Sequence, residues 1–156
     1  MDAGRMAVAQ DSQGAGFALW QAKNSIGMTH GGPMNQPCWP ELATPDPVAA
    51  VKFYSGLFGW TTVPDSGFES AQYIEWVNEK AHIGGLLPMR GPEWNGAPPR
   101  WMIYISVANC DERVAKAKDL GANVCVPPTD VPNTGRFSVI SDPQGAVFSL
   151  FQPKAT

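Results

Sequence analysis

Charged and metal-binding side chains are scarce in this sequence. Only 16% of its residues are charged, the formal net charge is -3, and histidine occurs twice. The sequence therefore lacks the basic surface that binding to nucleic acid requires, and nucleic acid is not an expected partner. With two histidines, the sequence also has few imidazole ligands for a metal site.

Cysteine is rare as well, and long hydrophobic runs are missing. The three cysteines, Cys38, Cys110 and Cys125, are odd in number and lack the spacing of a metal-binding cluster. This pattern indicates free thiols in a reducing, cytoplasmic setting. The first residues, MDAGRM, are polar, so we expect neither a secretory signal nor association with a membrane.

One motif occurs twice in the chain. Residues 4–23 read GRMAVAQDSQGAGFALWQAK, and residues 135–154 read GRFSVISDPQGAVFSLFQPK. In the second copy, Pro143 has the fixed φ that suits a turn, and Gly145 accepts a positive φ. Because alternating apolar residues flank both turns, each copy is predicted to form a β-hairpin.

The segment 37–90 has the pattern of a βαβββ unit. A strand at 38–43 precedes a helix that begins at Asp46-Pro47 and ends at Gly59. Three further strands are expected at 60–63, 72–78 and 81–88.

The segment 100–153 repeats this order. A strand at 101–107 precedes a helix capped by Asn109 or Asp111 and closed by Gly121, and then come a strand at 123–126 and the second hairpin. The sequence therefore predicts an α+β fold in which paired βαβββ units form a curved mixed sheet, with an extra N-terminal β-hairpin.

Two motifs connect this pattern to a known family. Residues 46–60 read DPVAAVKFYSGLFGW, and residues 142–148 read DPQGAVF. On these residues the chain resembles the vicinal oxygen chelate superfamily, which includes glyoxalase I, bleomycin-resistance proteins and extradiol dioxygenases.

The stretch WPELATPD at 39–46 is similar to the start of the second module in a subgroup with two tandem modules. The resemblance implies that residues 1–23 are the last hairpin of a preceding module. Residues 24–36 would then be a linker, and residues 37–153 a complete module.

A lone two-stranded hairpin is barely stable in water, and its open edges favour pairing with another strand. We therefore expect residues 1–23 to dock on a sheet edge of their own module or, by domain swapping, of a second copy. A homodimer formed through the hairpin or through sheet edges is predicted. The alternative is a frayed tail.

The resemblance also implies where a divalent metal would bind. Active members hold one metal with His or Glu side chains from the first and last strands of each unit. The corresponding positions here are Trp39, Met102, Ser149 and a residue near Gly84 or Gly85. None of these is a histidine or an acid, so no metal cofactor is predicted.

Two weak metal candidates remain. Glu41 lies two residues beyond Trp39, so the strand period of two directs both into the same cavity. Glu41 could bind a metal, act as a base or be a buried carboxylate satisfied by its neighbours. His82 begins a strand and is the other candidate, whereas His30 lies in the linker.

The inner face of the predicted sheet is aromatic and apolar, which is typical of a small-molecule site or of plain core. Six tryptophans in 156 residues favour a site or an interface. The predicted ligand-binding residues are Trp39, Glu41, Trp94, Met102, Tyr104, Ser149 and Phe151.

We expect a protein that binds a small hydrophobic or aromatic molecule and assign no catalytic residue. The alternative is a metal-dependent lyase, isomerase or dioxygenase that uses Glu41 and His82.

Overall fold

The computed structural model describes residues 2–28, 34–64 and 73–154. The chain divides into two compact lobes. Lobe 1 comprises Met1–His30 and Glu41–Trp101, and lobe 2 comprises Gly31–Pro40 and Met102–Thr156. In the described part of the chain, no helix is both long and apolar enough to cross a membrane.

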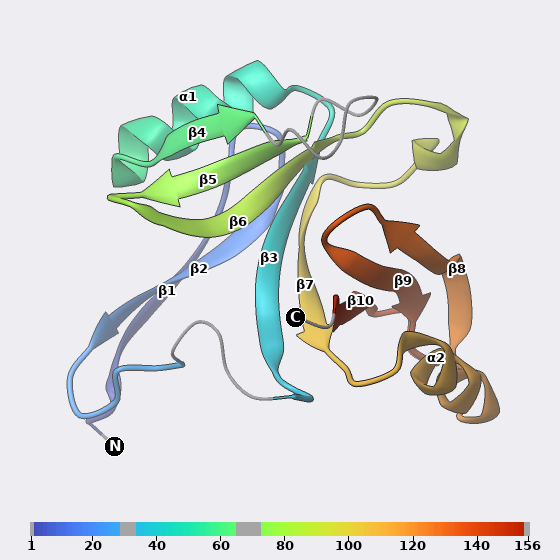
Figure 1. Cartoon of the computed structure of the whole chain (residues 1–156). Helices are drawn as coiled ribbons and strands as arrows, with labels where there is room; N and C mark the ends of the chain where they lie inside the picture. Colours follow the sequence, from blue (N-terminus) through green and yellow to red (C-terminus); the bar gives the residue numbers. More distant parts are fainter. Residues whose placement is uncertain (1, 29–33, 65–72, 155–156) are drawn as a thin grey trace. The chain divides into compact units, whose positions relative to one another are not determined.

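Lobe 1 contains helix α1, the separate β1–β2 hairpin and one run of four strands, of which β3 begins in lobe 2 (Figure 1). Its strands follow the order β4 (Thr61–Pro64), β5 (Ile74–Asn78), β6 (Ala81–Pro88) and β3 (Pro37–Thr44). Only β3 and β6 are parallel; the other pairs are antiparallel. The strand predicted at 72–78 is β5, which begins at Ile74. The first residue of that prediction, Gln72, lies outside the described residues.

Helix α1 (Pro47–Phe58) has the two ends that the sequence predicts. The Asp46 side chain accepts a hydrogen bond from the backbone N–H of Ala49 at 3.0 Å, and Pro47 occupies the first turn. Gly59 ends the helix with a φ of 73°, which a residue with a side chain adopts only under strain. The helix buries Ala50 and Tyr54 in a core cluster with Leu42, Trp76 and Leu86.

Lobe 2 has the same construction. Its strands follow the order β7 (Arg100–Ser106), β10 (Val147–Pro153), β9 (Gly135–Ser141) and β8 (Asn123–Val131). Strands β7 and β10 are parallel, and the other pairs are antiparallel. The α+β prediction of paired βαβββ units with mixed strand pairing is thus confirmed.

Two details of lobe 2 go beyond the prediction. Helix α2 (Cys110–Asp119) is capped by Asn109, whose side chain accepts from the Glu112 N–H at 3.1 Å. Strand β8 continues past Val126 through Pro127-Pro128 to Val131. Proline is tolerated there because β8 is an end strand, and its register with β9 shifts around these residues.

The two copies of the repeated motif form hairpins with the same turn. In β1 (Gly4–Gln10) and β2 (Gly16–Ala22), Asp11 Oδ1 accepts from the backbone N–H groups of Gln13 at 2.9 Å and Ala15 at 3.0 Å. In β9–β10, Asp142 Oδ1 accepts from the N–H groups of residues 144 and 146, each at 2.9 Å. Both predicted hairpins are therefore confirmed.

The turn of the β1–β2 hairpin docks beside helix α1 (Figure 1). The Gln13 side chain accepts from the Thr44 hydroxyl at 2.8 Å and from the Asp46 N–H at 2.9 Å, and donates to the Asp46 carbonyl at 2.9 Å. Ala15 is fully buried, and the Phe17 ring packs edge-on against the rings of α1.

The expectation that the hairpin adds to a sheet edge is wrong for the single chain. Among the strands of the described residues, β1 and β2 pair only with each other. Asp11 and Gln13 in the turn and Phe17 at the start of β2 contact the helix and its N-terminal cap. The hairpin is thus fixed to lobe 1 by side chains rather than by a strand ladder.

Tyr54 is the centre of this contact. Its hydroxyl donates to Asp11 Oδ2 at 3.1 Å and accepts from Trp101 Nε1 at 2.8 Å. Burial raises the pKa of Tyr54 well above its usual value, so the hydroxyl keeps the proton that it donates. The ring also stacks on Trp60 and meets the rings of Trp76 and Trp101 edge-on.

This aromatic core accounts for half of the tryptophans. Trp76 is fully buried, and Trp60 and Trp101 pack against the same cluster. For these three tryptophans, packing in the core of lobe 1 explains their presence, so they do not support a ligand site.

We predict that Tyr54→Phe lowers the free energy of unfolding by about 1–3 kcal/mol. The ring remains in place, but Asp11 Oδ2 and Trp101 Nε1 both lose a partner in a buried setting. Denaturant unfolding of Tyr54→Phe, Asp11→Asn and the double variant measures this. Because Tyr54 and Asp11 share a hydrogen bond, the double variant should lose less stability than the sum of the two single variants. A loss equal to that sum would show that Tyr54 and Asp11 do not interact.

Candidate functional site

The candidate site in lobe 2 is the face of its strands that lies away from α2. Ser149 on β10 is the register partner of Tyr104 on β7 and of Val139 on β9. Phe151 follows on the same face, beside Phe137. The alternate residues of β9 and β10, Ile140 and Leu150, pack with α2 in the core of the lobe.

The register therefore brings together four of the predicted binding residues. They are Met102, Tyr104, Ser149 and Phe151. Met102 and Ser149 are buried, whereas Tyr104 and Phe151 are half-buried. Tyr104 also lies near Phe137, with ring centroids 6.3 Å apart. This face therefore presents the aromatic rings of Tyr104 and Phe151 and the thioether of Met102.

One polar atom on this face has no partner. Ser149 is fully buried, and its hydroxyl makes no hydrogen bond to any residue that the structure describes. Leaving a buried hydroxyl unpaired costs about 1–3 kcal/mol.

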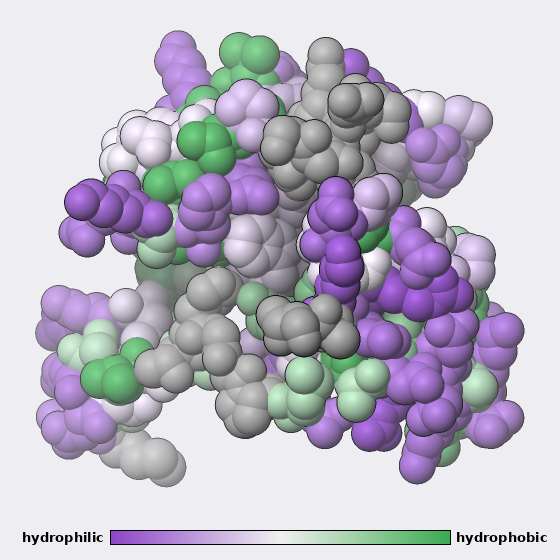
Figure 2. Space-filling view, viewed as in Figure 1, coloured by the Kyte–Doolittle hydropathy of each residue, from purple (hydrophilic) through white to green (hydrophobic). Residues whose placement is uncertain are grey.

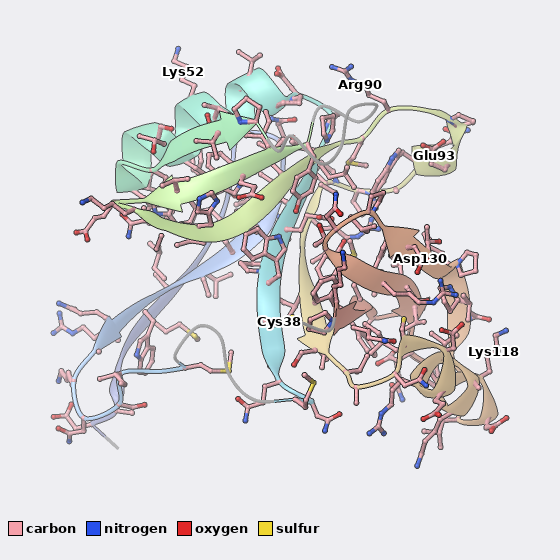
Figure 3. The ribbon with its side chains drawn as sticks, viewed as in Figure 1. Cys38, Lys52, Arg90, Glu93, Lys118 and Asp130 are labelled. Carbon is pink, nitrogen blue, oxygen red and sulfur yellow. The ribbon has the colours of Figure 1, made fainter. Side chains whose placement is uncertain are left out.

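Trp39 belongs to the part of β3 that lies in lobe 2 and is half-buried. Its neighbour Cys38 (labelled in Figure 3) donates a 3.4 Å hydrogen bond to the Tyr104 carbonyl. Burial raises the pKa of the Cys38 thiol, so it is protonated at neutral pH. Cys38 therefore holds the Tyr104 carbonyl as a neutral hydrogen-bond donor.

Glu41 lies in lobe 1 and is almost fully buried. It is the register partner of Gly85 on β6, and Gly85 is in turn opposite Glu75 on β5. The three positions form a row across the sheet, and the middle one has no side chain. This row lies on the sheet face opposite to the one that carries Leu42, Leu86 and Trp76.

Glu75 is a residue that the sequence reasoning missed. Its Oε2 contacts Nδ1 of His82, the other weak metal candidate. The two residues lie on the paired strands β5 and β6, joined by the tight turn at Glu79-Lys80, so the hairpin register could have revealed them. His82 is thus paired with Glu75.

The donor set does not fit the metal that the family usually binds. The positions expected to supply ligands offer an indole at Trp39, a thioether at Met102 and a hydroxyl at Ser149, where a hard divalent ion requires imidazole or carboxylate. Across residues 2–28, 34–64 and 73–154, no three His, Cys, Asp or Glu side chains are grouped to hold a metal ion. His30 lies outside these ranges.

Trp94 lines a hollow of its own in lobe 1. It ends the short helix η1 (Pro92–Trp94), and the Arg100 guanidinium lies 5.7 Å from the centre of its ring. The hollow has a volume of about 390 Å³ and is lined mainly by proline, glycine and Trp94, with Met89 and Asn95. Figure 3 shows Arg90 projecting outward from the same segment.

The chain is similar to several known proteins. A family model described as a glyoxalase-like domain matches residues 41–151. CFP32 of Mycobacterium bovis, provisionally named a glyoxylase, is 38% identical over 152 residues, which are 97% of this chain and 57% of that protein. Anthracycline biosynthesis protein DnrV of Streptomyces peucetius is 34% identical over 127 residues, 74% of this chain and 46% of that protein.

The chain thus spans about half the length of the curated relatives that it matches. Among solved structures, methylmalonyl-CoA epimerase of Mycobacterium tuberculosis has a TM-score of 0.56 at 13% identity, covering 83% of this chain and 95% of that one. At this identity the likeness shows the fold alone. Together with the fold and the motifs, the family match shows that the chain belongs to the glyoxalase-like family of the vicinal oxygen chelate superfamily.

Proposed function

We propose that this protein binds a small planar hydrophobic molecule without the help of a metal ion. The proposal rests on the side chains at the positions where the resemblance places the family's metal ligands, which here are Trp39, Met102 and Ser149. An indole, a thioether and a small hydroxyl favour contact with an apolar ring over coordination of a cation.

The lobe 2 face supports a ligand of this kind. The half-buried rings of Tyr104 and Phe151 provide stacking or edge contacts. The unpaired Ser149 hydroxyl provides one directional polar contact, so the ligand would have a carbonyl or hydroxyl group on its ring system. Two relatives are named for anthracycline biosynthesis, and anthracyclines have fused planar rings with such groups.

Trp94 and Glu41 lie in lobe 1, and for each a binding role within that lobe is proposed. Trp94 exposes part of its ring to a hollow of about 390 Å³, a volume in the range of small-molecule sites. Glu41 would offer a buried carboxylate to a polar group of the ligand.

The second candidate, a metal-dependent lyase, isomerase or dioxygenase, would rely on Glu41 and His82. The register separates these residues by Gly85 and Glu75, and His82 is engaged by Glu75. No observation in the described residues assigns a catalytic role to either side chain, so binding is the better-supported function.

The setting of the protein is part of the proposal. Its three cysteines are free, which supports a reducing, cytoplasmic compartment. The shared Asx turn of the two hairpins supports an origin of residues 1–23 as the last hairpin of a preceding module. We also propose that the protein is a homodimer.

The first prediction compares two phenylalanines on opposite faces of β10. Phe151 lies on the candidate face, whereas Phe148 packs with the α2 core. We expect Phe151→Ala to weaken binding of a fluorescent anthracycline about tenfold or more, because a stacking surface is lost. Phe148→Ala should leave affinity unchanged while lowering the melting temperature.

The measurement is fluorescence titration in EDTA, repeated with an anthraquinone and a flavone. Saturable binding that Phe151→Ala weakens and Phe148→Ala does not would support the proposal. Three outcomes would contradict it: no saturable binding of any of the three probes, equal losses in the two variants, or binding that requires an added divalent metal.

The second prediction compares two buried serines on neighbouring strands. Ser138 on β9 donates a 2.6 Å hydrogen bond to the Val126 carbonyl, whereas the Ser149 hydroxyl is unpaired. Ser138→Ala should therefore lower the free energy of unfolding by about 1 kcal/mol, and Ser149→Ala should leave it unchanged or raise it.

If Ser149 serves a ligand, Ser149→Ala should also weaken anthracycline binding several-fold. Denaturant unfolding and the same titration measure the two effects. A Ser149→Ala protein that is less stable and binds as well as the parent would show that the hydroxyl has a structural partner and no ligand.

A further inference from the structure

The loop between β6 and β7 borders a hollow that belongs wholly to lobe 1. Its lining residues come from the stretch between Met89 and Pro99, with Pro45 after β3, and its volume is about 390 Å³. The face that carries Ser149 belongs to lobe 2. The hollow, named here the Trp94 hollow, is therefore a second site, and its ligand can be inferred from its own residues.

The walls of the Trp94 hollow are held in place by the loop itself. Three of its lining residues are prolines, whose φ is fixed. The Asn95 N–H donates to the Pro92 carbonyl at 3.1 Å, which closes the turn of η1. The Met89 N–H donates to the Thr44 carbonyl at 2.9 Å, which fixes the start of the loop to the end of β3. A site held in this way loses little conformational freedom when a ligand binds.

Trp94 is the aromatic side chain of this lining, and a cation lies against it. The Arg100 guanidinium is 5.7 Å from the centre of the Trp94 ring, within the range of a cation–π contact. Nη1 of Arg100 also donates to the Pro98 carbonyl at 3.3 Å. Because Trp94 and Pro99 both line the hollow, Arg100 lies directly beside it.

The positive charge of Arg100 has no acidic partner in residues 2–28, 34–64 and 73–154. None of the ion pairs formed there includes Arg100 or Arg90. The Nε–H of Arg100 is in addition buried without a hydrogen-bond partner among these residues. A buried polar group that stays unpaired is costly, so an acceptor with negative charge is the partner that this side chain favours.

The loop around the hollow is also basic and hydrophilic. Residues 89–100 contain two arginines and one acid, Glu93, whose carboxylate folds against Gly91. Arg90 projects outward from the loop (Figure 3). Figure 2 shows the η1 segment, at the upper right, as pale and purple residues, of intermediate to hydrophilic character. This surface favours a ring compound that carries a negative charge over a purely hydrophobic one.

We propose that the Trp94 hollow binds a small aromatic carboxylate, with the ligand ring against Trp94 and the carboxylate on the Arg100 guanidinium. The planar fork of an arginine can donate two hydrogen bonds to one carboxylate. A volume of about 390 Å³ lies near the lower end for small-molecule sites, which favours one or two rings. The inference rests on the binding role proposed for Trp94 and adds the class of ligand.

The test compares two ligands that differ in charge. 2-Naphthoate and its neutral amide, 2-naphthamide, have the same ring system, so a difference in affinity reports the carboxylate. We expect calorimetric titration at low ionic strength to show saturable binding of 2-naphthoate, about tenfold or more tighter than that of 2-naphthamide. Added salt should weaken the binding of 2-naphthoate more than that of 2-naphthamide.

The two arginines of the loop supply matched variants. Arg100→Gln should lower the affinity for 2-naphthoate to that for 2-naphthamide, whereas Arg90→Gln should leave it within about twofold, because Arg90 points outward. Trp94→Leu should weaken the binding of both ligands, because the ring contact is lost. Melting temperatures show whether each variant is folded. The comparison of the two ligands on the parent protein requires no variant, so it stands even where Arg100→Gln is unstable.

The proposal is overturned by equal affinities of the parent protein for the two ligands, or by no saturable binding of 2-naphthoate at millimolar concentration. It is also overturned by a loss in Arg90→Gln as large as that in Arg100→Gln. The anthracycline titration reports on the lobe 2 face, and the 2-naphthoate titration reports on the Trp94 hollow. Failure of one with success of the other therefore shows which of the two proposals is wrong.

Discussion

The hydroxyl of Tyr54 is the contact on which the arrangement of lobe 1 depends. It joins three segments that are far apart in the sequence: the hairpin turn at Asp11, helix α1, and Trp101 at the start of β7. Because the hydroxyl is buried, each of its two hydrogen bonds satisfies a group that would otherwise be costly to leave unpaired. The surrounding rings then pack around a fixed point, and the hairpin becomes part of the core of lobe 1.

The repeated hairpin shows how one local sequence can serve two environments. The Asx turn at Asp11 and at Asp142 is the same, because in each copy a carboxylate accepts the N–H groups two and four residues later. In lobe 2 both outer edges of the hairpin are paired with strands, whereas β1 and β2 pair only with each other among the described strands. The side chains beyond the turn therefore have different neighbours in the two copies.

The candidate site differs from its family in donor chemistry rather than in fold. The resemblance implies that indole, thioether and hydroxyl groups stand at the positions where the family's metal sites use imidazole or carboxylate. Among the described residues, the Ser149 hydroxyl on this face is buried without a hydrogen-bond partner.

The sequence by itself determined the local elements. Helix caps at Asp46 and Asn109, the glycine after α1 and both hairpin turns depend on residues close together in the chain, so their patterns could be read directly. Strand parity likewise placed Met102, Tyr104, Ser149 and Phe151 on one face. Only the tertiary structure decided that Gln13 caps the start of α1, that Glu75 engages His82 and that three tryptophans are core. Those contacts depend on which distant segments meet and at what register, and a periodic pattern along the chain does not contain that information.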